Sequence, residues 1–295
     1  MLVSLIVTTR EDRVDRLERL LQSLSEGFYK LFEVVVVSQD CSNRIAPLLR
    51  EYQDSCCIKH LPNTRCSLST ARNIGLQSCA GRILGFPDDD CWYPTDTLSR
   101  VTDCFLADPD KAFVCTSVVD PLRRLPFSHR RNSKHSVRIS VANAFTFPIS
   151  VGIFINRLLI ESPFSFDERL GIGTDWGSGE ETDLILSLLL DGHKGVFQPA
   201  ITVYHEINYD REALFPFSKM FDYSRGFGAV IAKSIVRRKQ YAASWVYLDL
   251  LARAMIRLAL ACVTFQKSSF SYQLFRTKGM LTGLFEGARY YAQRH

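Results

Sequence analysis

The chain of 295 residues is 46% hydrophobic and 23% charged, a composition typical of globular proteins with one large or two small domains. Its nine cysteines are odd in number and never spaced as CxxC, which argues against a disulfide framework or a zinc site and favours a reducing cytosol. The net charge of +5 is unevenly distributed, because residues 211–295 hold 14 Lys and Arg against 4 Asp and Glu. We therefore expect an acidic catalytic body over residues 1–210 and a basic domain over 211–295 that faces an anionic partner.

Strand-type apolar runs and helical patterns alternate through the first part of the chain. Strands are expected at residues 2–8, 33–38, 57–59 and 83–86, and helices between them at residues 14–24, 44–52 and 69–79. This alternation predicts an α/β fold with a mostly parallel, Rossmann-like central sheet and right-handed crossovers. Ligands of such sheets bind beyond the carboxyl ends of the strands.

Polar clusters follow three of these predicted strands, and they read Thr8-Thr9-Arg10, Ser38-Gln39-Asp40 and Asp88-Asp89-Asp90. Because the carboxyl ends of parallel strands share one edge of a sheet, three such clusters indicate a binding site rather than unrelated turns. The chain has no GxGxxG and no GxxxxGK[ST] motif, which argues against a dinucleotide-binding fold and a P-loop.

The acidic cluster belongs to the stretch Phe86–Pro94, in which three adjacent carboxylates repel one another. They need a cation or a solvated surface beside them. A strand that runs into such a loop can present hard oxygen ligands to Mg²⁺ or Mn²⁺, which in turn bind a diphosphate. The alternative is an acidic turn that caps a helix starting near Thr95.

A second acid-rich segment reads Gly177-Ser178-Gly179-Glu180-Glu181-Thr182-Asp183. Its acids fall in the first turn of a helix that is expected to run to Asp191, where the helix dipole favours them. A carboxylate fixed there is also a well-held general base. Further along, His205 follows a predicted short strand, and it is either structural or a metal ligand.

A basic segment from Arg123 to Arg138 contains no acidic residue. It is either a solvated loop or a flap over an anionic ligand. Residues 111–118 and 149–155 are two further apolar runs, and the first is expected to be a strand.

Taken in order, these motifs resemble those of inverting family-two glycosyltransferases with the GT-A fold, over residues 2 to about 206. The resemblance rests on the strand before Thr8-Thr9-Arg10, on VVVSQD ending at Asp40, on STARNIG from Ser69 to Gly75, on FPDDDCWYP and on GSGEETDL. It implies a hexosyltransferase-type enzyme that moves a sugar from a nucleotide-diphosphate sugar to an acceptor hydroxyl and inverts the anomeric centre.

The resemblance also implies roles for individual residues. The residues that would bind the donor are Thr8, Thr9, Arg10, Asp40, Arg72, Asn73, Asp88 and Asp89. Asp90 and His205 would hold Mn²⁺ or Mg²⁺, and Trp176, Gly179 and Asp183 would lie on the acceptor side. Glu181 would take the proton of the acceptor hydroxyl.

Two positions depart from the family pattern. The family often has two acids after the second strand, where this chain reads Ser38-Gln39-Asp40. Its acceptor motif is usually Glu-Asp, where this chain has Glu180-Glu181. Both glutamates therefore remain candidates for the base, with Glu181 preferred.

The part from residue 211 onward is expected to be a helical extension. Phe221–Ala229 is similar to a segment of bacterial transferases that build surface polysaccharides on lipid-diphosphate acceptors at the cytoplasmic face of the membrane. The best candidate for a membrane span, residues 244–265, contains Asp249, Arg253 and Arg257 at intervals of four and is expected to be an amphipathic helix. Residues 1–7 are too short for a signal-peptide core.

These features predict a cytoplasmic protein that is peripheral at the inner face of the membrane, with a saccharide or lipid-linked saccharide as acceptor. The alternative for the extension is a helical cap that packs on the catalytic domain. UDP is the favoured donor nucleotide, and GDP or dTDP fits the same acids. Nucleic-acid binding is not expected, because the basic part has no stacking motif. The rival functions are a non-catalytic GT-A-like scaffold subunit and a metal-dependent nucleotidyltransferase or phosphohydrolase.

Overall fold

The structure is a computed structural model that describes residues 1–39, 43–123, 125–126, 133–161, 164–206 and 217–293. The chain forms two compact units. The sheet unit comprises Met1–Phe166 and Ser187–Ile207, and the helical unit comprises Asp167–Leu186 and Asn208–His295. The helical unit therefore includes the acid-rich segment around residue 180 as well as the basic part. The expected domain boundary at residue 210 lies outside the described residues.

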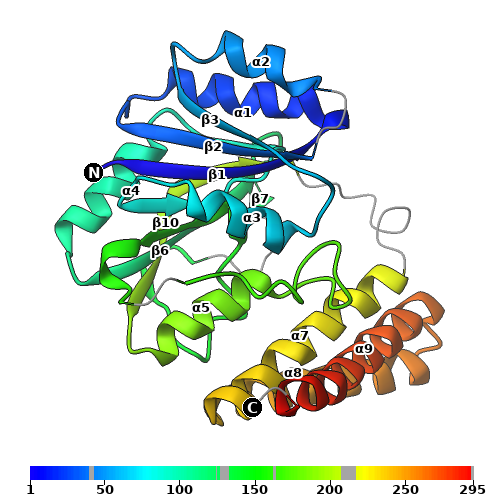
Figure 1. Cartoon of the computed structure of the whole chain (residues 1–295). Coiled ribbons are helices and arrows are strands. Elements are labelled where there is room, and N and C mark those ends of the chain that lie inside the picture. The colour runs from blue at the N-terminus through cyan, green and yellow to red at the C-terminus, as the bar shows by residue number, and fades with distance from the viewer. Residues whose placement is uncertain (40–42, 124, 127–132, 162–163, 207–216, 294–295) are drawn as a thin grey trace. The chain divides into compact units, whose positions relative to one another are not determined.

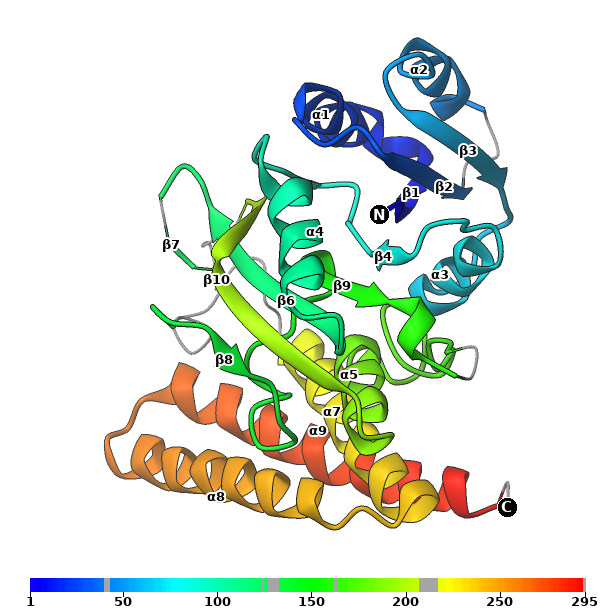
Figure 2. The ribbon, with the colours of Figure 1, turned by 90° about the vertical axis from the view of Figure 1, so that its left-hand side faces the viewer.

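Parallel strands form one half of the central sheet, as the alternation of strands and helices predicts. Their order is β3-β2-β1-β4 (Figures 1 and 2), with bounds β1 Val3–Arg10, β2 Phe32–Gln39, β3 Cys57–Pro62 and β4 Ile83–Gly85. All four strands end at one edge of the sheet, because each neighbouring pair is parallel.

The other half of the sheet is mixed. β9 (Ile153–Asn156) runs antiparallel between β4 and β6 (Lys111–Asp120), and β6 is parallel to β10 (Lys194–His205). Two-residue strands complete it by antiparallel pairing: β5 (Cys91–Trp92) and β8 (Val137–Arg138) pair with β10, and β7 (Leu125–Pro126) pairs with β6. The 12-residue β10 is longer than the short strand predicted before His205.

Helices cover both faces of the parallel half (Figures 1 and 2). On one face, apolar side chains of three helices share a core with alternate residues of β1 and β2, and these helices are α1 Val14–Glu26, α2 Ile45–Glu51 and α4 Thr97–Ala107. α3 (Leu68–Gln77) packs on the other face, against Ile6 and Val37. Short 3-10 helices occur at Glu11–Arg13, Ser150–Gly152 and Arg157–Leu159. Because both faces are covered, Val34 to Val37 of β2 are all fully buried, which explains their unbroken apolar run.

Gly75 of the STARNIG segment is explained by this packing. A Cβ atom at Gly75 would lie 2.4 Å from Cγ2 of Ile6 on β1. α3 can therefore approach the sheet closely only with glycine at this position. That approach brings the preceding residues, Arg72 and Asn73, to the sheet.

The helical unit consists of α7 (Phe217–Arg238), α8 (Ala242–Val263), α9 (Lys267–Ala292) and the segment from Asp167 into α5 (Glu180–Leu190). α7 and α9 meet almost backbone to backbone, because a Cβ at Gly283 would lie 1.8 Å from the carbonyl oxygen of Arg225. The helical extension expected from the sequence is thus present. No helix among the described residues has both the length and the hydropathy of a membrane span.

The buried carboxylate of Glu33 contacts residues of several neighbouring segments. Glu33 on β2 accepts hydrogen bonds from the Ser4 hydroxyl and, at 2.6 Å, from the backbone N–H of Ala80, and its other oxygen lies 2.7 Å from Nζ of Lys59. Burial acts to raise the pKa of Glu33, but these hydrogen bonds and the Lys59 charge outweigh burial, so that the pKa lies below its ordinary value.

This arrangement predicts how Glu33→Gln changes stability. A carboxylate with a lowered pKa contributes stability above its unfolded pKa of about 4.3 and loses it as the pH falls through the folded value. We expect Glu33→Gln to lower the free energy of unfolding at pH 7 by about 1–3 kcal/mol. Urea titrations should show the gap from wild type closing below pH 4.5, whereas a gap that is constant from pH 7 to pH 3 would contradict this account.

Candidate active site

The acidic segment Asp88–Asp90 lies where strands from distant parts of the chain meet. Asp88 follows β4 closely and forms a parallel β-bridge with Thr8 near the end of β1. Immediately afterwards, β5 pairs with β10 in a register that sets Cys91 opposite His205. The carboxyl ends of β1, β4 and β10 therefore assemble one polar site from Thr8, the three aspartates and His205.

Asp88, Asp90 and His205 could hold a metal ion together. One ligand atom from each of them lies within 4.8 Å of the other two. Nε2 of His205 is 3.2 Å from Oδ1 of Asp90, and its Nδ1 is 2.8 Å from the carbonyl oxygen of Glu206. With Nδ1 donating to that carbonyl, Nε2 is the nitrogen available to a metal, which is the usual arrangement of ligating histidines. Two carboxylates and one imidazole fit Mn²⁺ or Mg²⁺.

The protein supplies its own cations to Asp90. Oδ2 of Asp90 is 3.3 Å from Nη1 of Arg16 and 3.6 Å from Nη1 of Arg13. Burial acts to raise the pKa of Asp90, but His205 and the two arginines outweigh burial, so that its pKa lies below the ordinary value. For His205, burial acts to lower the pKa, and the hydrogen bond and charge of Asp90 raise it above the ordinary value. Asp90 therefore remains ionised when no metal is bound.

Asp89 is the buried member of the acidic segment. It is 3% exposed, and Oδ1 accepts a hydrogen bond of 2.9 Å from Arg13. Burial raises the pKa of Asp89 above its ordinary value despite this arginine. Asp89 thus fixes Arg13 beside Asp90.

The STARNIG segment contains a residue, Arg72, that forms an ion pair with Asp88. Arg72 is 1% exposed, and its Nη2 donates to Oδ1 of Asp88 at 3.0 Å. Asn73 exchanges two hydrogen bonds with the backbone of Phe166, at 3.0 and 2.8 Å. Both residues expected to bind the donor therefore also make contacts that orient the site, Arg72 toward Asp88 and Asn73 toward Phe166.

The remaining donor-side predictions lie at the end of β1 and β2. Thr8 is half-buried beside Asp88, Thr9 is buried, and Arg10 is paired in register with Gln39. Asp40 lies outside the described residues. Much of the basic segment, residues 124 and 127–132, lies outside them as well, so the choice between loop and flap stays a prediction.

Sequence reasoning missed the arginines of α1 and its entry. Three arginines recur every three residues and lie along the acidic segment, namely Arg13, Arg16 and Arg19. The guanidinium carbon of Arg19 lies 3.8 Å from the ring centroid of Trp92. Arg19 also forms an ion pair with Glu206. The available signal was this spacing on a helix directly after the first strand. Its partners became evident only from the fold.

The acid-rich segment of the helical unit packs closely against α7 and α9. Gly179 has φ of +95°, and a Cβ there would lie 2.8 Å from Cγ2 of Val230, so a glycine is required on both grounds. Trp176 is buried and packs on Tyr290 and Tyr291 with ring centroids 5.5 Å apart in each pair. The first turn of α5 is thus held against α7 and α9.

The acids of that first turn differ in their surroundings. Glu180 is buried at 6% exposure, whereas Glu181 is half-buried. Asp183, which was expected on the acceptor side, is buried and lies 2.6 Å from Nζ of Lys233 on α7. Of the two candidate bases, Glu181 is the more accessible.

Lys233 links two carboxylates, those of half-buried Asp167 and buried Asp183. Its Nζ is 2.8 Å from Oδ2 of Asp167 and 2.6 Å from Oδ2 of Asp183, and the Tyr291 hydroxyl donates to Asp167 at 2.7 Å. Burial acts to raise the pKa of Asp167, but Lys233 and Tyr291 outweigh it and the pKa is lowered. Helices α7 and α9 therefore fasten both ends of the segment that contains the candidate base.

We expect Lys233→Met to lower the free energy of unfolding by about 3 kcal/mol, because it leaves buried Asp183 and half-buried Asp167 without their shared cation. Lys233→Arg keeps the charge and should retain most of the stability. Chemical denaturation of the three proteins at pH 7 measures this difference. Equal denaturation midpoints for Lys233→Met and wild type would show that the lysine does not hold these acids.

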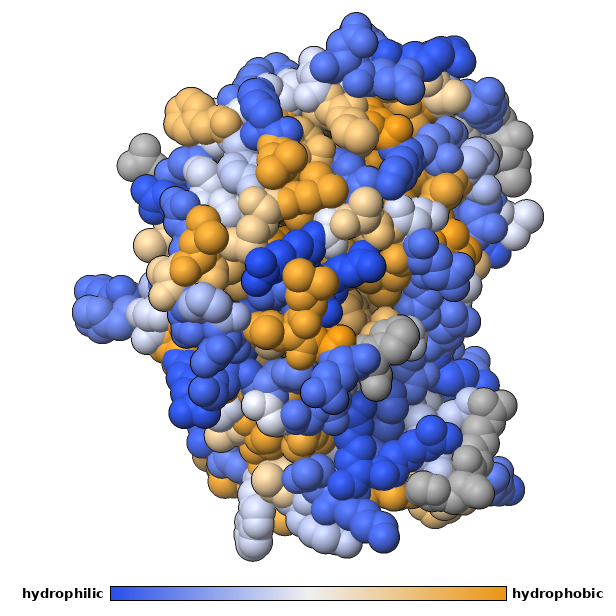
Figure 3. Space-filling model, turned by 60° about the vertical axis from the view of Figure 1, so that its left-hand side comes forward, coloured by the Kyte–Doolittle hydropathy of each residue, from blue (hydrophilic) through white to orange (hydrophobic). Residues whose placement is uncertain are grey.

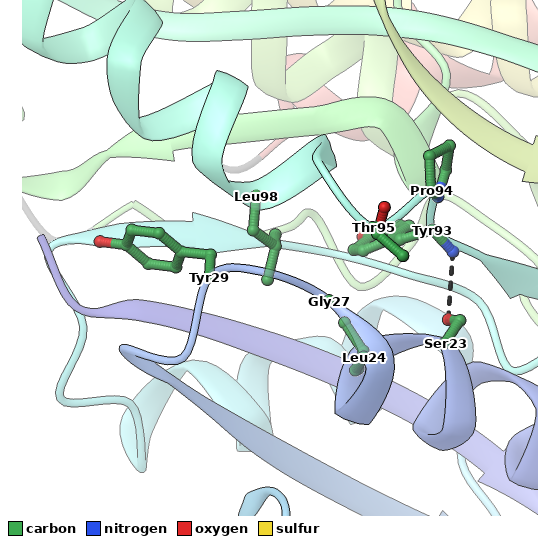
Figure 4. Close-up of a pocket in the computed structure, with 8 residues that line it drawn as sticks. All are labelled: Ser23, Leu24, Gly27, Tyr29, Tyr93, Pro94, Thr95 and Leu98. Carbon is green, nitrogen blue, oxygen red and sulfur yellow. Dashed lines mark hydrogen bonds between the residues drawn. The ribbon is translucent and has the colours of Figure 1, made fainter.

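A small pocket elsewhere in the sheet unit contains none of these residues (Figure 4). It lies between the end of α1 and the start of α4, and it is lined by Ser23, Leu24, Gly27, Tyr29, Tyr93, Pro94, Thr95 and Leu98. The Ser23 hydroxyl accepts a hydrogen bond of 3.1 Å from the backbone N–H of Tyr93 there. Its lining has no charged side chain, which makes it unsuited to a nucleotide diphosphate.

Residues 4–165 match the family model described as glycosyl transferase family 2. No curated protein matches the sequence significantly.

Solved structures with this fold include glycosyltransferases. Mannosyltransferase PcManGT from Pyrobaculum calidifontis, in complex with GDP-Man and Mn²⁺, is 18% identical with a TM-score of 0.64, over 96% of this chain and 87% of that one. S. aureus TarS 1–349 in complex with UDP-GlcNAc is 14% identical with a TM-score of 0.61, over 94% and 90%. At this identity the likeness shows the fold, a GT-A fold.

Proposed function

The chain belongs to glycosyl transferase family 2, and from this premise we propose that it is an inverting, metal-dependent enzyme that transfers a sugar from a nucleotide-diphosphate sugar to an acceptor hydroxyl. The observation that carries the proposal is the cluster of Asp88, Asp90 and His205 at the carboxyl edge of the sheet. Membership of the family supports sugar transfer, and the cluster supports dependence on a divalent ion.

On this proposal Asp90 and His205 would hold Mn²⁺ or Mg²⁺, and the ion would supply positive charge to the diphosphate leaving group. Asp88, held by Arg72, accepts hydrogen bonds from the ribose hydroxyls. One carboxylate can accept hydrogen bonds from two neighbouring hydroxyl groups. Arg13 and Arg16 add fixed positive charge beside Asp90, within reach of an anion bound there. Thr8, Thr9, Arg10 and Asp40 complete the donor side.

Glu181 is the proposed base. The carboxylate of Glu181, in the first turn of α5, can take the proton of the acceptor hydroxyl as the oxygen attacks the anomeric carbon. Direct displacement from the face opposite the leaving group inverts that carbon. Glu180 is the alternative base, and its burial makes it the less accessible one.

The donor is proposed to carry UDP, with GDP as the alternative, since the similar structures were solved with UDP-GlcNAc and with GDP-Man. The proposed acceptor is a saccharide or a lipid-linked saccharide at the cytoplasmic face of a membrane. Its support is the resemblance of Phe221–Ala229 to polysaccharide-building transferases and the basic charge of the helical part.

Replacing Asp90 tests the donor site. We expect Asp90→Ala to weaken Mn²⁺-dependent binding of UDP or GDP by about 100-fold or more, because loss of a metal's outer-shell partner alone costs 10–100-fold. Calorimetric titrations with Mn²⁺ and with a chelator measure the effect. Asp96→Ala, at a half-buried acid of the same unit that pairs with Arg100, is the control and should bind as wild type does. Metal-independent nucleotide binding by wild type would refute the metal site.

Replacing the two glutamates separately tests the base. Glu181→Gln should bind nucleotide normally and lose transfer by about 10²–10⁴-fold, the usual contribution of a general base. Release of nucleoside diphosphate with a panel of saccharide and lipid-linked acceptors measures transfer. Glu180→Gln is the matched variant. Normal turnover by Glu181→Gln beside an inactive Glu180→Gln would transfer the role to Glu180.

A further inference from the structure

The outer side of α8 is apolar and exposed. Six of its large apolar side chains are between 51% and 75% exposed, namely Trp245, Leu248, Met255, Ile256, Leu260 and Val263. Its buried side is narrow and consists of Ala243, Tyr247, Ala254 and Ala261. At 100° per residue, five of the six exposed residues fall within one sector opposite the buried side, with Leu260 at its edge. We call these six residues the α8 apolar face.

This concentration is specific to one part of the protein. Of twenty large hydrophobic residues exposed in the described chain, twelve lie between Tyr241 and Phe285. Figure 3 shows one side of the molecule, on which hydrophobic and hydrophilic residues are interspersed. α8 lies alongside α9 in Figure 2 and stacks Tyr247 on Phe227 of α7, so its inward side is the partnered one.

A polar stripe borders the α8 apolar face. Asp249, Arg253 and Arg257 recur every four residues, and all three are exposed. Arg253 pairs with Asp249 at 2.8 Å, which leaves the stripe with the net charge of Arg257. Residues 211–295, to which α8 belongs, hold 14 basic against 4 acidic residues. An apolar helix face in a basic part of the chain is complementary to an anionic lipid surface.

Aromatic rings stand at both ends of the face. Trp245 is 75% exposed near the start of α8, and Phe265 is 90% exposed directly after its end. Aromatic side chains favour the boundary between headgroups and acyl chains. Phe265 also has φ of +54°, a conformation that bulky residues rarely adopt, and this turn leaves its ring in solvent.

We propose that the α8 apolar face is a membrane-docking surface that lies in the headgroup region of an anionic bilayer, with α8 parallel to the surface. This inference rests on one part of the proposed function, the peripheral membrane contact. It assigns that contact to one helix face. A second copy of the chain fits less well, because a symmetric pairing would bring two strongly basic segments together.

The experiment measures binding of the full-length chain to vesicles, without nucleotide or metal. We expect sedimentation with vesicles containing 30% phosphatidylglycerol in phosphatidylcholine, and weaker sedimentation with phosphatidylcholine alone or in 0.5 M salt. Ile256→Asp should weaken binding by about tenfold or more, because it removes one apolar side chain from the interface and adds a charge of the wrong sign. Arg257→Gln should weaken it by about fivefold at low salt.

Matched variants on the sheet unit serve as controls. Phe28 is 73% exposed and Leu158 is 68% exposed, so Phe28→Ser compares with Trp245→Ser, and Leu158→Asp with Ile256→Asp. The two sheet-unit variants should bind vesicles as wild type does. Thermal unfolding of each variant checks that it is folded. Trp245→Phe should keep binding but lose the quenching of tryptophan fluorescence by brominated lipids.

The proposal is overturned if wild type does not bind anionic vesicles, or if Ile256→Asp binds as tightly as Leu158→Asp does. It is also overturned if light scattering shows a dimer that Ile256→Asp dissociates while vesicles are not bound, because a second copy then covers the face. Nucleotide titrations of the same variants keep the two proposals separate. Vesicle binding without nucleotide binding would support docking and refute the catalytic proposal.

Discussion

Three consecutive carboxylates at the end of a buried strand are the constraint around which the sheet unit is built. Each has its own cationic contact from a different element: Asp88 pairs with Arg72 of α3, Asp89 with Arg13 before α1, and Asp90 with Arg16 and His205. Without these contacts the three charges would repel one another in a poorly solvated position. The elements that supply the cations are also those that the strands place at the ligand-binding edge. The same contacts therefore neutralise the aspartates and form the site.

The helical unit solves a similar problem with one cation. Lys233 lies between Asp167 and Asp183, and glycines let α7 and α9 approach closely enough for Tyr291 to reach Asp167. The acids of the family motifs fall into two groups in both units. Some are accessible, as Glu181 is, and others are buried and paired with a cation, as Asp89 and Asp183 are. A motif alone does not separate these two states, because they differ in partners distant in the chain.

Local patterns were sufficient for the parallel half of the sheet. The unbroken valines of β2, the leucine spacing of α1 and the alternation of strands and helices each depend on burial that repeats along the sequence. They were not sufficient for the long-range pairs. Nothing near Arg13 or Arg16 indicates Asp89 or Asp90, and nothing near Asp183 indicates Lys233. Likewise, β9 enters the sheet antiparallel from 70 residues beyond β4, and the apolar face of α8 became apparent only when its other side was seen to be covered.

The hydrogen bond from Tyr291 to Asp167 joins residues 124 positions apart. During translation, the segment that contains the candidate base is therefore synthesised well before its last anchor. At 5–20 residues per second, roughly 6–25 s separate the two. Once residue 205 has been made, the sheet unit has all of its described strands and its acidic cluster, while Asp167 and Asp183 still lack Lys233 and Tyr291. A nascent chain thus completes its acidic cluster before the first turn of α5 has its last contact.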